Sequence, residues 1–500
     1  MHVIEQSFAI FVLPFCFESS TFAARVAAVE RDRLESGEPP WPVWERRRFP
    51  KDDLLRHVAD YLNPPPGVTP TAYLWTLSNQ VLRSPRGLGL GRDMVGLWLS
   101  HRQRPATGQD GPETPGSGPL PLQVDTIDLA LFGVGMGYLI FRTRLGSRKA
   151  DDWLDFLNGF RFIDRPGQVD LLFSRRTGKD QVSPFYPPLA ASSDRAAEGR
   201  GVVMHLVSGL LGRLAPDDGW WREVFVPGQM LPFYALQFGQ VSPPGEQPDE
   251  QPRMLYRLRK FFRAGQALVP SADDLRPDHP ALLPYADRMW FSLTLEGGGF
   301  VAFDPPDTDF WTSTMVEHLQ EQYFLLFLLA LHQRCTLMTL SEQVCARWLR
   351  EDQPELIERF TQLRESLLEF TARGYFTQVM QRDNHHRCFR AWQRVFEVEP
   401  LYREVRDEVT DLHGMLMLRK TERIRQLGEE QRGYSERLNI WFGVVAVLLG
   451  LPSVALAFLQ VIQETSPQVA RLSVLGAMAL GGLLILLHRL WHGRQNRRSD

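Results

Sequence analysis

The amino-acid sequence predicts an α+β (mixed) cytoplasmic domain, a long helical stalk and a two-helix transmembrane hairpin near the C-terminal end of the chain. Three observations lead to this fold class. Strand patterns and turn signals run to about residue 310, helical spacing of apolar residues then replaces them, and two apolar runs follow. The predicted parts are the domain 1–310, the stalk 311–438, the hairpin 439–492 and a basic cytoplasmic tail 493–500.

The composition argues against several classes of protein. The chain has 500 residues, and its 56 basic and 59 acidic residues give a net charge of −3. A general nucleic-acid binder is usually basic overall, so we expect no direct nucleic-acid binding. The four cysteines are too few and too scattered for a disulfide framework, which fits a reducing compartment. The sequence lacks the short motifs of common hydrolases and redox proteins, so we predict neither an enzyme nor a cofactor.

Strand and turn patterns predict the elements of the N-terminal domain. Residues 1–20 are apolar but have no basic start, so they indicate a buried strand rather than a signal peptide, and the domain is expected to be cytoplasmic. The other expected elements are a helix at 50–63, two strands around a glycine-rich turn at 124–145, a helix at 150–163 and a hairpin at 288–306. Flexible loops are expected at 103–121, 176–200 and 241–253.

The region from about Thr312 to Asn439 has helical spacing of apolar residues and almost no strand signal. Its most apolar part, Tyr323–Leu331, has nine residues and is too short to span a bilayer. The last part, Pro400–Asn439, is predicted to run as a helix directly into the membrane.

Two segments beyond this region are apolar enough to cross a membrane. The first, 440–462, has no charged residue in the 20 positions from Ile440 to Leu459. A helix of that length spans about 30 Å, the thickness of the bilayer hydrocarbon. The second segment, 472–491, follows a connection so short that we expect a hairpin turn.

Basic residues around the two segments predict their orientation. Several arginines and a lysine precede the first segment and more arginines follow the second, whereas the turn holds only Arg471. Both ends of the chain should therefore be cytoplasmic, in a multi-pass protein of the inner (plasma) membrane. Trp441 and Trp491 would then anchor at the same interface. A buried helical hairpin in a soluble protein is the alternative.

The first segment carries a stripe of small and polar residues, which we call the seam. Its members are separated alternately by four and three positions, a heptad repeat that places them on one helix face and favours a left-handed crossing. The seam consists of Asn439, Gly443, Ala446, Gly450, Ser453, Ala457 and Gln460.

Two interpretations of the seam stay open. In one, it packs on the second segment of its own hairpin, because helices in lipid approach closely through small residues. In the other, copies of the first segment surround an axis and the seam lines a narrow pore, with Asn439, Ser453 and Gln460 as polar groups at three depths. Pro452 predicts a kink at mid-span.

The layout resembles the CorA family of divalent-cation channels, whose cytoplasmic α/β domains sit on a stalk helix followed by two membrane helices and a basic tail. The resemblance covers the C-terminal third of the chain. Leu451-Pro452 matches a Leu-Pro that the family often has in its first membrane helix. The family's Gly-Met-Asn signature is absent, because that position holds Val461-Ile462-Gln463, where Gln463 would keep an amide at the outer mouth.

The resemblance implies an oligomeric ion channel or transporter, a homopentamer in the lipid bilayer that is gated by its cytoplasmic domain. Divergent relatives include effectors of bacterial defence systems, in which a nucleotide signal gates the membrane part. The alternative is therefore a membrane-anchored ligand sensor or defence effector, with a small nucleotide-like ligand and a hairpin that anchors to or perturbs the membrane. The transported ion and any metal-binding residues stay unknown.

Other motifs have simpler explanations. The glycines in 84–93 and 133–137 lack the context of phosphate-binding loops, so we interpret them as a loop and a hairpin turn. His385 and His386 point about 100° apart on a helix and cannot both bind one metal, so we interpret them as part of a solvated helix. His332 beside Cys335 is interpreted as core packing.

Overall fold

The computed structural model describes most of the chain. The described residues are 2–34, 41–79, 94–101, 120–163, 169–176, 182–185, 202–215, 219–225, 228–239, 250–265, 268–348 and 355–461, with 472, 475–476, 479 and 482–483. The chain divides into two compact units, Met1–Val409 and Thr410–Asp500.

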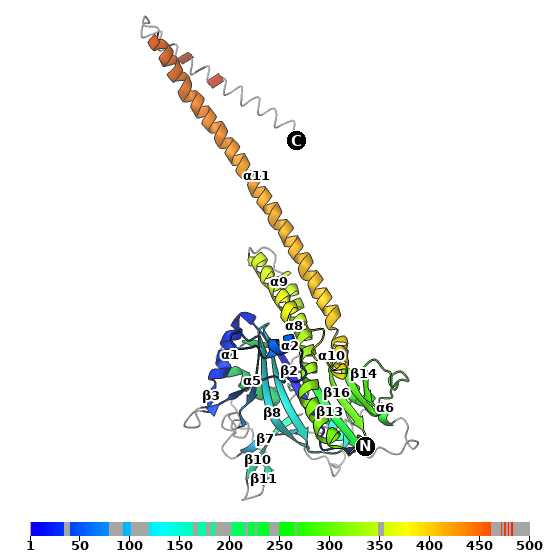
Figure 1. Ribbon diagram of the computed structural model, residues 1–500. Helices are drawn as coiled ribbons and strands as arrows, with labels where there is room; N and C mark the ends of the chain where they lie inside the picture. The colour runs from blue at the N-terminus through cyan, green and yellow to red at the C-terminus, as the bar shows by residue number, and fades with distance from the viewer. Residues whose placement is uncertain are drawn as a thin grey trace, which may run out of the picture. The chain divides into compact units, whose positions relative to one another are not determined.

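The first unit is built on one large β-sheet (Figure 1). Its strands are β1 His2–Val3, β2 Phe8–Phe17, β5 Trp44–Arg47, β6 Ala72–Leu77, β7 Met94–His101, β8 Leu120–Phe132, β9 Met136–Leu145, β10 Val169–Arg176, β11 Val182–Phe185, β12 Trp221–Glu223, β13 Leu231–Gly239, β14 Leu282–Ala286, β15 Met289–Thr294 and β16 Gly297–Phe303. Among the described residues the main path runs β11-β10-β7-β8-β9-β2-β13-β16-β15-β14. Beside that path, β1 pairs with β13, β12 with β2, and β5 with β6, which also pairs with β8. The β13–β16 pair is parallel, and β3 Arg33–Leu34 and β4 Trp41–Pro42 form a separate small sheet.

Helices cover both faces of the sheet (Figure 1). One core contains residues of α1 Phe22–Arg31, α4 Ala150–Gly159, α5 Val202–Gly212 and α6 Glu250–Arg259. The opposite core contains residues of α2 Arg56–Leu62, α7 Met315–His318, the π-helical turn η4 Leu319–Tyr323, α8 Phe324–Trp348, α9 Glu355–Arg373 and α10 Asp383–Val395. The remaining elements are the 3₁₀ turn η1 Ser19–Thr21, the π-helical turn η3 Phe310–Thr314 and the long helix α11 Val398–Val461.

Strand β2 lies inside the sheet, between β9 and β13. All ten of its residues are buried. Phe8, Ile10 and Val12 belong to the core under α8, whereas Phe11 and Leu13 belong to the core on the opposite face. A strand that is covered on both faces has a continuous run of apolar residues. This explains why the composition of β2 resembles that of a signal sequence.

The structure confirms several local predictions. β8 and β9 flank the turn at 133–137, α4 covers most of 150–163, and β15 and β16 form the hairpin within 288–306. The helix predicted at 50–63 is present but shorter, because α2 begins at Arg56. The fold class is confirmed in its coarse form, a mixed α and β domain with a large sheet and several helices.

Three predicted loops contain regular structure at positions that the structure describes. Strand β8 already begins at Leu120, inside the predicted loop 103–121, and β11 occupies Val182–Phe185 inside 176–200. Helix α6 begins at Glu250, inside 241–253. Proline and glycine content led to these loop predictions, but pairing with a neighbouring strand or packing on the sheet outweighs such local signals.

The first compact unit extends to Val409, not to 310, the end of the predicted N-terminal domain. Helices α8 and α10 contribute residues to the core under the sheet, so they form a layer of the domain rather than a stalk. The start of α11 also belongs to this unit, since Val398, Val405 and Val409 are buried. Burial of these apolar faces requires a partner surface, and the sheet supplies it.

One helical stretch of the described residues, Phe310–Val344, is long and apolar enough to cross a membrane by length and composition. Within its most apolar window, 78% of the residues are buried inside the protein. A helix buried in the core of a folded domain passes the same test, and the packing of α8 against the sheet shows that it is such a core helix. The predicted segment 472–491 lies largely outside the described residues, as do the turn before it and the tail.

Candidate functional site

The seam lies on α11, which continues through Pro452 to Val461. Asn439, Gly443 and Ala446 are exposed and Gly450 is half-buried. Ser453, Ala457 and Gln460 occupy the following turns of the same helix, but their side chains lie outside the described set. A β-carbon added at Gly443 or Gly450 would meet no described atom within 4 Å.

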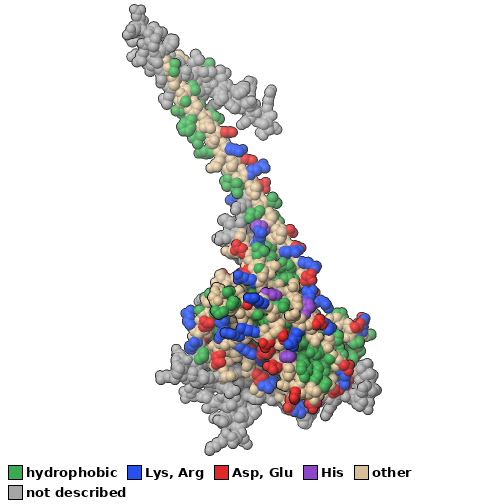
Figure 2. Space-filling model, viewed as in Figure 1, with side chains coloured by type: hydrophobic (Ala, Val, Ile, Leu, Met, Phe, Trp, Pro, Cys, Tyr) green, Lys and Arg blue, Asp and Glu red, His purple; other side chains and the backbone are tan. Residues whose placement is uncertain are grey.

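Large apolar side chains surround the seam and are open to solvent in the single chain. Trp441 is 69% exposed, and Phe442 and Val454 are similarly open. Figure 2 shows charged side chains along the lower part of the long helix and hydrophobic ones without charges farther along it. Large apolar side chains exposed together are typical of surfaces that a membrane or a partner chain covers.

Two predicted positions at the far end of this region, Gln463 and Trp491, lie outside the described residues. The hairpin itself and the role of Gln463 at an outer mouth therefore stay predictions.

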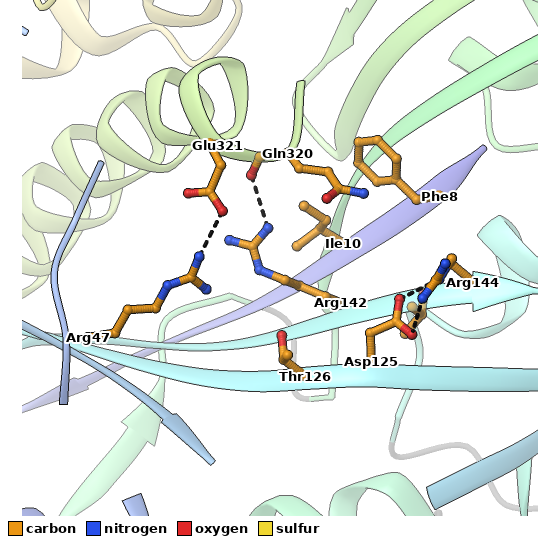
Figure 3. A pocket seen from close by; sticks show the side chains of 10 residues that line it. Phe8, Ile10, Arg47, Asp125, Thr126, Arg142, Arg144, Gln320 and Glu321 are labelled. Atoms are coloured by element: carbon orange, nitrogen blue, oxygen red, sulfur yellow. Dashed lines mark hydrogen bonds and ion pairs between the residues drawn. The ribbon is translucent and has the colours of Figure 1, made fainter. Parts of the chain in front are cut away.

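A second candidate site is a polar pocket of about 320 Å³ in the first unit (Figure 3). Its wall combines β2, the end of β5, β8, β9 and the π-helical turn η4. The lining includes Phe8 and Ile10 together with the charged residues Arg47, Arg142, Arg144, Asp125 and Glu321. Because these residues are far apart in the sequence, the sheet topology alone brings them together.

Asp128 beside this pocket is the centre of a buried ion-pair network. Its side chain is 1% exposed. Arg142 Nε donates to its Oδ2 over 2.9 Å, Thr76 Oγ1 donates to its Oδ1 over 2.7 Å, and Arg47 Nη1 lies 3.7 Å from Oδ2. A buried carboxylate is tolerated only with such compensation, so the network fixes the two arginines to the sheet.

Both arginines also reach the π-helical turn, as Figure 3 shows. Arg47 Nη2 donates to Glu321 Oε1 over 2.7 Å, and Arg142 Nη1 donates to the carbonyl oxygen of Gln320 over 2.9 Å. Arg144 instead forms a two-pronged pair with Asp125 on the sheet. The widened turn is therefore held by two cationic groups from the sheet, and π-helical turns are frequent at functional sites.

The same turn contacts α10. His385 Nε2 and Gln322 Oε1 are 3.0 Å apart, so the histidine donates, and the ring of His385 stacks on Tyr323 at 4.5 Å between centroids. Burial, with a contribution from Arg382, lowers the pKa of His385 to about 4. The imidazole is therefore neutral at physiological pH, consistent with a donor to one amide oxygen.

Helix α10 leads to α11 through a joint of two residues, Phe396 and Glu397. Glu397 has a φ of 53°, in the left-handed region that residues other than glycine rarely adopt. Phe396 is fully buried and its carbonyl oxygen accepts a hydrogen bond from Arg334 Nη1 over 2.7 Å. The joint is thus held by α8, and contacts run continuously from the polar pocket through η4 and α10 to the start of α11.

His332 on α8 is a core residue, as predicted. Its Nε2 lies 3.2 Å from the hydroxyl of Tyr61 and its Nδ1 lies 3.3 Å from the hydroxyl of Tyr138, while its ring stacks on Phe132. Burial lowers the pKa of His332 to about 3. Both ring nitrogens of His332 already face tyrosine hydroxyls, and burial raises the pKa of the neighbouring Cys335 thiol, so this thiol is protonated at neutral pH and is a poor nucleophile.

The interpretation of 382–388 as a solvated helix is wrong for its inner face. His385 and Cys388 are buried, because α10 packs into the core of the domain. Among the described residues, no group of three or more histidine, cysteine or acidic side chains could hold a metal ion. The region 84–93 lies outside the described residues.

Sequence reasoning did not single out the basic run Glu45–Lys51, which supplies Arg47 and ends beside the polar pocket. Its three consecutive arginines, Arg46–Arg48, and the triple proline at 64–66 that follows could have indicated a binding site in this region. Asp128, Arg142 and Glu321 had no such signal, since none of them belongs to a run of charges or to a recognisable motif.

Comparison with known proteins gives no relative for this chain: no family model, no curated protein and no solved structure matches it.

Proposed function

We propose that the protein is an oligomeric ion channel or transporter of CorA-like architecture in the inner membrane, with both ends of the chain in the cytoplasm and gating by the first compact unit. One observation carries this proposal. At the apolar, uncharged end of α11 the large side chains of Trp441, Phe442 and Val454 are exposed, whereas the apolar stretch that contains α8 is mostly buried. An exposed apolar helix of that length is stable in lipid or against copies of itself, and not in water.

The continuity of α11 supports gating. The helix begins with residues buried in the first unit and continues without a break into the apolar segment. A rotation or shift of its first turns would therefore reach the seam directly, because a helix transmits such motion along its hydrogen-bonded backbone. A helix that serves only as a membrane anchor needs no continuous connection of this kind to a folded domain.

A membrane-anchored ligand sensor or defence effector is the second candidate. The polar pocket next to η4 favours it, since its contacts lead to the start of α11. In this case the hairpin anchors to or perturbs the membrane, and the seam packs within a single chain. The two candidates differ in whether first membrane helices from different subunits meet on the seam.

Cysteine cross-linking in native membranes tests this difference. Cys16, Cys335 and Cys388 are buried and can stay, so the background variant needs only Cys345→Ser. Ser453→Cys is then oxidised in membranes and run on a denaturing gel. We expect a disulfide-linked dimer, because five copies around an axis bring their seams together.

The matched controls are Leu448→Cys and Ala455→Cys, which lie on the opposite side of the helix from the seam, given 3.6 residues per turn. They should give no dimer under the same oxidation. Absence of the Ser453→Cys dimer, with the protein present in the membrane fraction, would reject the pore and favour the anchored sensor. Equal dimer yields at all three positions would indicate random collision.

A further inference from the structure

A second cavity of about 610 Å³ lies beside the polar pocket and shares Arg47 with it. The apolar part of its lining, which we call the floor, consists of Phe49, Leu62, Ala72 and Leu74 with the prolines at 64–66 and Pro70. The volume lies in the range of small-molecule sites, which are mostly apolar with a few well-placed polar groups.

Basic residues also line this cavity. Arg46, Arg47, Arg48 and Lys51 line it, and Asp60 is the acidic residue among its lining. Asp60 forms an ion pair over 3.8 Å with Arg56 on its own helix. The lining therefore has more cationic than acidic side chains, which favours an anionic ligand.

The four cations differ in how they are held. Arg46 pairs with Glu30 and stacks on Tyr73 at 3.9 Å, so its guanidinium already has two partners. Arg48 and Lys51 are exposed and form no ion pair with any residue that the structure describes. They are the two cations free to meet a ligand.

The wall behind these cations is rigid. The side-chain amide of Asn63 bonds both backbone groups of Phe49, accepting from its N–H and donating to its carbonyl oxygen, each over 3.2 Å. Thr71 Oγ1 donates to the carbonyl oxygen of Tyr61 over 2.8 Å. These bonds fasten the basic segment and the proline segment to the end of α2, so the cavity exists without a ligand.

Arg47 links the cavity to the contacts that lead to α11. It lies at the boundary, 36% exposed, and its guanidinium pairs with Glu321 of η4. An anion in the cavity would compete with Glu321 for Arg47, because both supply oxygen acceptors to the same guanidinium. Release of Glu321 would free one of the two cationic contacts that hold η4, which in turn contacts His385 of α10.

We propose that this proline-floored basic cavity binds a small organic phosphate, an anion that also carries an apolar group, and that Arg47 changes partner from Glu321 to the ligand. The phosphate would lie against Arg47, Arg48 and Lys51, and the apolar group against the proline floor. The inference rests on the proposed function, since it names the class of ligand that would act on α11 through the first unit.

Calorimetric titration of the full chain in detergent tests the site, with phenyl phosphate as the probe and inorganic phosphate and phenol as its separate halves. We expect phenyl phosphate to bind more tightly than either half. Arg48→Ala combined with Lys51→Ala should weaken its binding at least about tenfold, the loss expected for one charge-assisted contact. The control pair Lys260→Ala with Arg373→Ala removes the same charges from exposed positions outside the cavity and should leave the affinity unchanged.

The exchange of partners makes an opposite-sign prediction. Arg47→Ala should weaken phenyl phosphate binding, whereas Glu321→Gln should strengthen it several-fold by freeing Arg47. A merely structural ion pair would give weaker binding in both variants, which would overturn the exchange. Absence of phenyl phosphate binding to the unmodified chain, or equal weakening by the control pair, would overturn the site. Binding without the Ser453→Cys dimer would keep this site and reject the pore, so the two proposals fail separately.

Discussion

The buried histidine on α8 makes the stability of the first unit depend on pH. His332 has a pKa of about 3 in the folded protein, below its ordinary value of about 6.5, because burial disfavours the charged form. The unfolded chain binds a proton at this residue below pH 6.5 and the folded chain does not, down to about pH 3. The stabilising contribution is therefore complete above pH 6.5 and is lost as the pH falls from there towards 3.

The magnitude follows from the difference between the two pKa values. Between pH 7.5 and pH 5 the lost stability from His332 is about 2 kcal/mol, since each pH unit in the window contributes about 1.36 kcal/mol. We expect His332→Gln to reduce the change in unfolding free energy over this range by about that amount. Urea unfolding of the purified full chain, followed by tryptophan fluorescence at several pH values, measures it.

A matched variant separates titration from packing. Tyr61→Phe removes one hydroxyl partner of His332 but keeps the imidazole in the core. It should lower stability by about 1 kcal/mol at every pH and keep the pH dependence of the unmodified protein. If His332→Gln and the unmodified chain lose stability equally between pH 7.5 and pH 5, then His332 is charged or solvated in the folded protein and the reasoning is wrong.

Three further predictions concern the frame of the first unit, and urea unfolding of the full chain measures each. Gly299→Ala should destabilise the protein by about 3 kcal/mol or more, because the added β-carbon would overlap the carbonyl oxygen of Tyr234 on the neighbouring strand. The control Gly414→Ala, on a helix with open space around it, should be neutral or stabilising. Equal effects of the two substitutions would contradict the strand register. Asp128→Asn should lower the free energy of unfolding by about 3 kcal/mol, because it leaves two arginines without their buried counter-charge. A decrease below about 1 kcal/mol would mean that the network is solvated. Glu397→Gly should stabilise by about 0.5 to 1 kcal/mol by relieving a left-handed backbone, and destabilisation would show that the glutamate side chain itself holds the joint.

Local pattern alone determined much of the fold. The hairpin within 288–306, the strands around 133–137 and the helical region after 310 follow from apolar spacing and turn residues, which act over a few positions. The same spacing defined the seam on α11. Local pattern wrongly predicted loops where β11 and the start of α6 lie. Turn-forming residues occur inside these elements, which are stabilised by neighbours distant in the sequence.

Only the tertiary structure distinguished the two apolar helices and assembled the polar sites. The apolar surface of α8 packs against the sheet, whereas Trp441, Phe442 and Val454 on α11 are exposed, a difference that composition does not contain. Arg47 and Glu321 meet because the sheet places β5 under η4. Such contacts depend on how distant segments cross in space, and a chain's periodicity constrains only the face that each segment buries.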